Sequence, residues 1–159
     1  MKSRQNPIDY AYKKECLEQL QTLEKQGHNE IFYADESGFS LNPVIPYSWQ
    51  YPKEQVRVFP QRSQQTNVFG LMSQDNRLFT FKQQGSIKTD FIIESIDNWA
   101  KNKTKTTIVV MDNAAIHQAQ AMKEKIKQWQ NQHLFVFFLP TYSRIDGPTA
   151  FKQNRNSLA

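Results

Sequence analysis

Residues 106–117 read Thr-Thr-Ile-Val-Val-Met-Asp-Asn-Ala-Ala-Ile-His. The four residues before Asp112 form an apolar run rich in β-branched side chains, which is typical of a strand buried on both faces of a sheet. The run stops at Asp112-Asn113, and an amphipathic helical pattern follows at once. Open α/β sheets usually carry their chemistry at the carboxyl ends of central strands. Asp112 is therefore a candidate metal ligand, with capping of the next helix as the structural alternative.

An earlier segment repeats this pattern. Ile31-Phe32-Tyr33-Ala34 predicts a short strand that stops at Asp35. If the two strands are neighbours, Asp35 and Asp112 converge, and a hard divalent cation relieves the repulsion between their carboxylates. A pair of Mg²⁺ ions roughly 3.5–4 Å apart could then activate a water or a 3′-hydroxyl and stabilise the leaving oxygen at phosphorus. This is the mechanism of nucleases and strand-transfer enzymes.

The rest of the chain predicts a mixed α/β sheet with an antiparallel early hairpin and later parallel strands, flanked by helices. Helices are expected at residues 9–26, capped by Asp9, and at residues 88–101. Residues 67–72 and 78–81 are expected to form the hairpin, and residues 134–139 a final buried strand.

The helix expected after Asn113 has an apolar and a basic face. We expect its apolar positions to lie in the core and its lysines on a solvated face. The apolar positions are Ala115, Ala119, Met122, Ile126 and Trp129, and the lysines are Lys123, Lys125 and Lys127.

Length and composition fit one domain with a proper core, at 159 residues and 38% hydrophobic content. No stretch approaches the roughly 20 apolar residues of a membrane span, and no signal peptide is recognisable, so a cytoplasmic location is expected. The single cysteine, Cys16, excludes an internal disulfide and fits a reducing compartment. Its helical spacing indicates a small core residue.

The net charge of +5 is concentrated in the part of the chain that also holds Asp112. Such an excess suits a polyanionic partner such as nucleic acid, although a mixed-charge solvated surface looks the same. Residues 39–62 are rich in proline and interleave aromatic and cationic side chains, which could stack on bases or pin the loop onto the sheet. These side chains are Tyr47, Trp49, Tyr51, Lys53, Arg57 and Arg62.

Four segments in order along the chain resemble the DDE domain of mariner-type transposases, and the bacterial insertion-sequence branch most closely. The similar region runs from about Ile31 to Ser143, which divides the chain into residues 1–30, 31–143 and 144–159. The four segments are Phe-Tyr-Ala-Asp-Glu-Ser-Gly-Phe at 32–39, Asn-Val-Phe-Gly at 67–70, Val-Met-Asp-Asn-Ala-Ala-Ile-His at 110–117 and Phe-Leu-Pro-Thr-Tyr-Ser at 138–143.

The resemblance implies an RNase H-like fold and a DNA partner, namely transposon ends and target. It makes Asp35 the first catalytic acid and Asp112 the second, both ligands of catalytic Mg²⁺, with Mn²⁺ as a substitute. Glu36 is expected on the opposite face of its strand, beyond direct contact with the metal. His117 matches a recurrent histidine of the family that either orients the site or contacts phosphate, with capping or packing at a helix start as the alternative.

The third acid of the family is a Glu in a helix beyond the Pro-x-Tyr-Ser segment, and the resemblance fails there. Ungapped counting puts Ala150 at that position, and no Glu follows Glu124. Asp146 lies too early and beside Gly147 to be a good substitute. We expect residues 144–159 to be an aberrant tail, from a frameshift or truncation after Ser143. A different reading frame over these codons that encodes the missing Glu would establish the frameshift.

Relatives also carry helix-turn-helix domains that read the element ends, and only one helix is expected before the first strand here. The predicted function is therefore a metal-dependent transposase catalytic domain for DNA cleavage and strand transfer, and we expect it to be truncated and inactive. A non-catalytic DNA-binding relic, or a regulator of an intact transposase, is the alternative. An RNase H-like nuclease is a third reading. An intact transposase or a second copy of the chain would be a protein partner, and no membrane partner is expected.

Overall fold

The computed structural model describes residues 6–39 and 65–140 of the chain. The predicted aromatic and cationic side chains of residues 39–62, from Tyr47 onward, lie outside the described residues. The same holds for Asp146, Ala150 and the whole of the predicted tail. In the part of the chain that the structure describes, no helix is long and apolar enough to cross a membrane.

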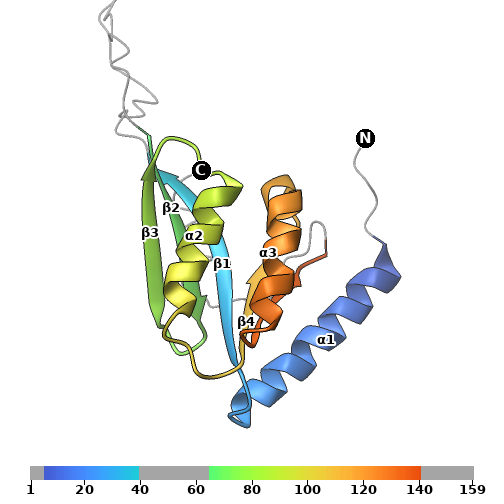
Figure 1. Ribbon diagram of the computed structural model, residues 1–159. Helices are drawn as coiled ribbons and strands as arrows, with labels where there is room; N and C mark the ends of the chain where they lie inside the picture. The colour runs from blue at the N-terminus through green and yellow to red at the C-terminus, as the bar shows by residue number, and fades with distance from the viewer. Residues whose placement is uncertain (1–5, 40–64, 141–159) are drawn as a thin grey trace, which may run out of the picture.

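A five-stranded mixed sheet forms the centre of the fold, with the strand order β3-β2-β1-β4-β5 (Figure 1). The first three strands along the chain pair antiparallel, whereas β1, β4 and β5 run parallel. The predicted mixed sheet, with its early hairpin and later parallel strands, is confirmed. The strands are β1 (Glu30–Phe39), β2 (Thr66–Ser73), β3 (Leu78–Gln84), β4 (Thr107–Met111) and β5 (Leu134–Phe138).

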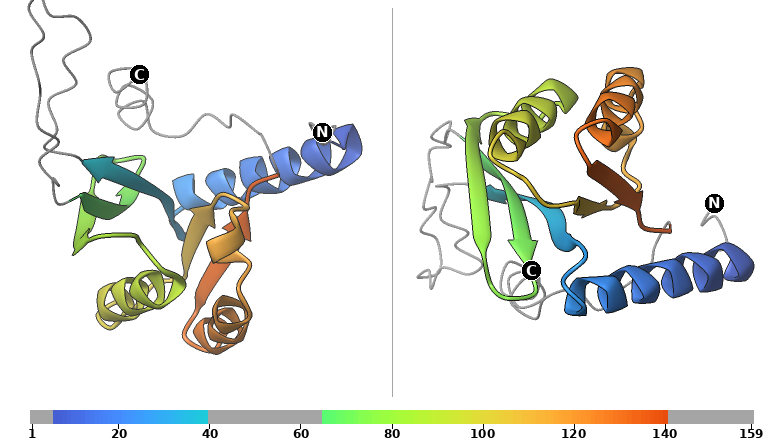
Figure 2. Two further views of the ribbon diagram at one scale, coloured as in Figure 1. Left: turned by 90° about the horizontal axis from the view of Figure 1, so that it is seen from above. Right: turned by 60° about the horizontal axis from the view of Figure 1, so that its bottom comes forward.

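Helices cover both faces of the sheet (Figure 2). Helix α1 (Pro7–Lys25) lies on one face, and α2 (Thr89–Ala100) and α3 (Gln120–Gln130) lie on the other. Every residue of β4 is buried, as the apolar run before Asp112 predicts. Its alternate side chains enter two separate clusters: Val109 and Met111 pack beneath α2 and α3, and Ile108 and Val110 pack beneath α1.

Strand β1 is longer than the sequence predicts. The prediction of a strand that stops at Asp35 is wrong, because β1 continues through Asp35 to Phe39. The cause lies in the neighbouring strand: the backbone of β2 pairs with β1 as far as Phe39 and Thr66. These ladder hydrogen bonds outweigh the weak strand preference of the Asp-Glu-Ser-Gly sequence. Helix α1 likewise starts earlier than predicted, with Asn6 rather than Asp9 as its cap.

The expected continuous helix after Asn113 is interrupted. A short 3₁₀ turn, η1 (Ala115–His117), comes first, and α3 begins only at Gln120. Ala115 is therefore exposed, contrary to the prediction that it is core, whereas Met122 and Trp129 are buried as predicted. Strand β5 is also less buried than expected: Phe135 is 39% exposed.

A polar contact joins the two helices on the same face of the sheet. The indole N–H of Trp129 donates a 2.7 Å hydrogen bond to Oδ1 of Asp97 on α2. The other oxygen of Asp97 lies 2.7 Å from Nζ of Lys125. Lys125 thus forms a tertiary ion pair, and the prediction that it lies on a solvated face is wrong.

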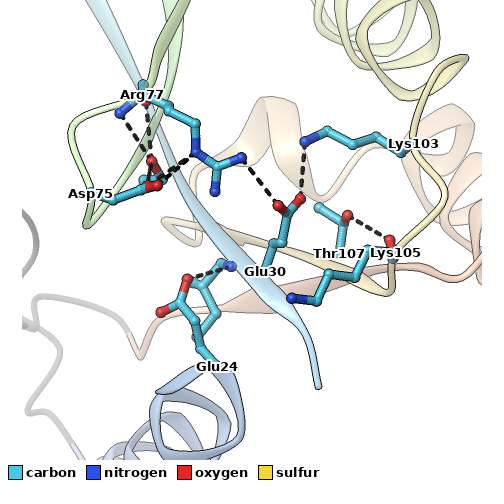
Figure 3. A network of polar contacts seen from close by, with 9 residues as sticks. Glu24, Glu30, Asp75, Arg77, Lys103, Lys105 and Thr107 are labelled. Atoms are coloured by element: carbon cyan, nitrogen blue, oxygen red, sulfur yellow. Dashed lines mark hydrogen bonds and ion pairs between the residues drawn. The ribbon is translucent and has the colours of Figure 1, made fainter. Parts of the chain in front are cut away.

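A charge network closes the amino end of β1 (Figure 3). The carboxylate of Glu30 lies 3.1 Å from both Arg77 and Lys103. Burial by itself raises the pKa of Glu30, but the hydrogen bonds from Lys103 and Arg77 outweigh burial and hold the pKa below its ordinary value. The Lys103 ammonium also lies 4.4 Å from the ring centre of Phe32 and 4.7 Å from that of Trp99. Glu30 is thus neutralised by side chains of the chain itself.

We expect Trp129→Phe to lower the free energy of unfolding by about 2 kcal/mol. The smaller ring leaves unfilled space at a fully buried position and removes the hydrogen bond to Asp97. Urea denaturation measures the change. Lys127→Ala, on an exposed position of the same helix, is the matched control and is expected to stay within about 0.5 kcal/mol of wild type. Equal losses in both variants would contradict the role given to Trp129.

Candidate functional site

Asp35 lies on β1, and Asp112 directly follows the neighbouring parallel strand β4. The pairing of β1 with β4 is described as far as Tyr33 and Val110. Extending this register by two residues puts Asp35 level with Asp112, which directly follows β4. Because adjacent strands lie roughly 4.8 Å apart, the two residues occupy the same edge of the sheet. The Asp112 side chain is 54% exposed there.

Side-chain alternation along β1 separates Asp35 from Glu36. Asp35 continues the α1 face of Ile31 and Tyr33, and Glu36 continues the face of Phe32 and Ala34, beneath α2 and α3. The backbone N–H of Glu36 donates a 3.1 Å hydrogen bond to Oδ1 of Asp35, which helps to orient that carboxylate.

His117 connects Glu36 to Asp112. Its Nε2 lies 2.8 Å from Oε1 of Glu36, and its Nδ1 lies 2.8 Å from Oδ1 of Asp112. The same Nδ1 lies 3.0 Å from the backbone carbonyl oxygen of Asp112. The His117 side chain is only 1% exposed. Both ring nitrogens therefore face oxygen atoms inside the protein, an arrangement that suits a doubly protonated imidazolium.

The pKa of His117 reflects these contacts. Burial by itself lowers the pKa of the imidazole, because it disfavours the charged ring. Hydrogen bonds to Asp112 and Glu36, together with the negative charge of Glu36, outweigh burial and raise the pKa of His117 to about 10. The ring therefore carries a positive charge at neutral pH.

The structural alternative for Asp112, capping of the next helix, is only partly correct. Oδ1 of Asp112 accepts a 3.2 Å hydrogen bond from the backbone N–H of Ala114, which stabilises the turn after β4. Helix α3 itself starts beyond Ala119, so Asp112 is not its cap. With this contact formed, the Asp112 side chain is still 54% exposed.

The sequence does not predict the contact between Glu36 and His117. The two residues are 81 positions apart, and no local spacing joins them. A weak signal is present: each of them is close in sequence to one of the two acids, Glu36 beside Asp35 and His117 five residues after Asp112.

A family model described as DDE superfamily endonuclease matches residues 30–144. The chain belongs to this DDE superfamily. The match covers β1, β4 and η1, and therefore includes Asp35, Asp112 and His117. No curated protein sequence is a significant match to the chain.

Solved structures of the Mos1 mariner transposase share the fold of this DDE domain. The Mos1 strand transfer complex matches with a TM-score of 0.56 at 16% identity, over 98% of this chain and 55% of that chain. The Mos1 paired end complex with Mn matches with a TM-score of 0.56 at 18% identity, over 98% of this chain and 56% of that chain. The catalytic domain of Mos1 matches with a TM-score of 0.52 at 14% identity, over 99% of this chain and 84% of that chain. The predicted RNase H-like fold is confirmed, and the chain spans about half the length of the Mos1 chains in the complexes.

The carboxylates of the DDE domain suit a hard divalent cation. Mg²⁺ is commonly bound in proteins by one or two carboxylates, and its other positions are filled by water and substrate phosphate. Asp35 and Asp112 are the candidate oxygen ligands at this edge of the sheet. Within residues 6–39 and 65–140, no group of three His, Cys, Asp or Glu side chains is placed to hold a metal ion. The described donors therefore fit a cation shared with the substrate better than a closed structural site.

The raised pKa of His117 predicts a pH-dependent stability. Between the unfolded pKa of 6.5 and the folded pKa of about 10, the folded chain keeps a proton that the unfolded chain has lost. The free energy of unfolding should therefore fall as the pH rises through this window, by at most about 1.4 kcal/mol per pH unit. Urea denaturation at several pH values between these limits measures the slope.

His117→Gln should remove this contribution and give a shallower slope than wild type. His28→Gln, which changes an exposed histidine, is the control and should keep the wild-type slope. Identical slopes for wild type and His117→Gln would show that the His117 proton is not held more tightly in the folded chain.

Proposed function

We propose that this chain is a metal-dependent DDE transposase catalytic domain, built to cleave DNA phosphodiester bonds and to join 3′-hydroxyl ends to a target. The observation that carries the proposal is that Asp35 on β1 comes level with Asp112, directly after the neighbouring strand β4, when the β1–β4 register is extended by two residues in this DDE-superfamily fold. The related Mos1 structures are a strand transfer complex and paired end complexes with Mn and with Mg. These titles support DNA ends as substrates and a divalent cation as cofactor.

In this proposal Asp35 and Asp112 are the metal ligands. Their carboxylates supply the hard oxygen atoms that Mg²⁺ prefers, and Mn²⁺ is a chemically suitable substitute. The bound cation would activate a water or a 3′-hydroxyl and stabilise the leaving oxygen at phosphorus. The protein contributes position: the pairing of β1 with β4 sets the two residues at one height along the strands, and the backbone N–H groups of Glu36 and Ala114 donate hydrogen bonds to their carboxylates.

We further propose that the chain comes from the bacterial insertion-sequence branch, acts in the cytoplasm and cleaves DNA poorly. The assignment to the bacterial branch rests on the motif at residues 110–117, and the cytoplasmic location follows from it, because bacterial DNA lies in the cytoplasm. The expected poor cleavage rests on Ala150, which stands where related transposases carry their third catalytic acid. The division into residues 1–30, 31–143 and 144–159, with an aberrant last segment, is part of the same proposal.

The charge of the chain supports an alternative function. A net charge of +5 suits DNA binding without catalysis, as expected of a relic or of a regulator that associates with an intact transposase or with a second copy of itself. Salt-dependent DNA binding that is unchanged by Asp35→Asn, in a chain that binds no divalent cation, would favour this alternative.

We expect Asp35→Asn and Asp112→Asn each to weaken Mn²⁺ binding by at least about tenfold, because each removes a charged oxygen ligand. Electron paramagnetic resonance of free Mn²⁺ measures the affinity. Asp90→Asn, an exposed acid on α2, is the matched control and should bind Mn²⁺ as wild type does. Equal Mn²⁺ affinities in wild type and both site variants would contradict the assigned ligands.

We expect no strand cleavage above background when the chain is incubated with Mg²⁺ or Mn²⁺ and the DNA that flanks its own gene. Loss of one group from a catalytic unit commonly lowers the rate by several orders of magnitude. Gel analysis of end-labelled DNA measures cutting. Robust cleavage that disappears in Asp112→Ala would overturn the expected inactivity and support DDE chemistry. Robust cleavage that persists in that variant would contradict the assigned site.

A further inference from the structure

Glu36 and His117 form a polar connection between the two strands of the candidate site. Glu36 lies on β1 beside Asp35, and His117 lies in the η1 turn beyond Asp112. The imidazole ring spans the space between the strands and contacts a carboxylate at each nitrogen, at 2.8 Å in both cases. A side chain on one strand is thereby coupled to the carboxylate that follows the other.

The burial of His117 decides between the roles open to it. With its side chain 1% exposed and both nitrogens directed at Glu36 and Asp112, the ring presents no polar atom to a substrate. Contact with a DNA phosphate would require the ring to leave both carboxylates and enter solvent. Orientation of Asp112 requires no movement at all. The geometry therefore favours an orienting role.

The η1 turn that carries His117 is itself held in place. The hydroxyl of Thr89 at the start of α2 donates a 2.9 Å hydrogen bond to the carbonyl oxygen of Ile116. The N–H of His117 donates to the carbonyl oxygen of Ala114 at 3.0 Å. These contacts fix the backbone of His117. Oδ1 of Asp112 therefore has two donors at fixed positions, the Ala114 N–H and the His117 ring.

We propose that Glu36 and His117 are positioning residues that hold the Asp112 carboxylate ready for a divalent cation, an inference that rests on the proposed function of Asp112 as a metal ligand. Glu36 fixes the ring of His117, and the ring fixes Oδ1 of Asp112. Metal-binding carboxylates in proteins are commonly hydrogen-bonded in this way, and removal of such a partner typically costs 10- to 100-fold in metal affinity. Neither residue touches the cation or the DNA in this arrangement.

The test compares two conservative substitutions of Glu36 in the full chain. Glu36→Gln keeps the reach of the side chain and an acceptor oxygen but loses the charge, whereas Glu36→Asp keeps the charge but is one methylene too short for His117. If position matters, Glu36→Asp and His117→Ala should weaken Mn²⁺ binding by about tenfold, and Glu36→Gln should recover most of the affinity. Glu94→Ala, an exposed acid on α2, is the control for loss of a remote negative charge.

A second readout needs neither the metal nor activity. Proton NMR of the metal-free chain should show slowly exchanging imidazole N–H resonances of His117, and Glu36→Asp should broaden both of them while Glu36→Gln preserves the one directed at Asp112. Urea midpoints confirm that each variant is folded. Should His117→Ala fail to fold, the Glu36→Asp and Glu36→Gln pair alone decides.

The two readouts separate this inference from the proposed function. One outcome is that wild type gives sharp His117 resonances, which Glu36→Asp broadens, but does not bind Mn²⁺. This outcome would overturn the metal site, and with it the proposal that Glu36 and His117 position Asp112 for a cation. Mn²⁺ binding that is equal in wild type, Glu36→Asp and His117→Ala would overturn the positioning role while the metal site stands. Weaker binding in Glu36→Gln than in Glu36→Asp would show that the charge of Glu36, and not its position, matters.

Discussion

The parallel pairing of β1 with β4 is the constraint on which the candidate site depends. Four residue pairs, from Glu30 and Thr107 to Tyr33 and Val110, set the height of one strand against the other. A slip by one residue would turn every following side chain to the opposite face and would remove the match between the two aspartates. The buried side chains resist such a slip, because Val109 and Ile108 belong to clusters on opposite faces of the sheet.

Much of this arrangement could be predicted from local pattern. An unbroken apolar run rich in β-branched residues, such as the one before Asp112, is typical of a strand that is covered on both faces, and β4 is such a strand. The hairpin expected at residues 67–72 and 78–81 is formed by β2 and β3, and Asn76 in its turn adopts a positive φ of 65°, a conformation that asparagine tolerates well. The order of helices and strands and the mixed character of the sheet followed from these signals.

Other features depend on contacts that no short segment contains. The extension of β1 through Asp35 comes from pairing with β2, whose partner residues, from Gly70 opposite Asp35 to Thr66 opposite Phe39, come much later in the chain. The break between η1 and α3 is set in part by Thr89, which bonds to the η1 backbone from another helix. The ion pair of Lys125 requires Asp97 on α2. Residue preferences predict local conformation well, but these partners are chosen by the tertiary fold.

The pairing of Phe39 with Thr66 has a consequence for how this domain can vary. The chain leaves β1 and enters β2 at two residues that already face each other, so the ends of the intervening segment are fixed by the sheet. For loops in general, each doubling of the length adds only about 0.6 kcal/mol of closure entropy. Length changes at this point need not disturb the height of Asp35. Inserted sequence at this end of the β1–β2 pair would therefore leave the pairing of β1 with β4 unchanged.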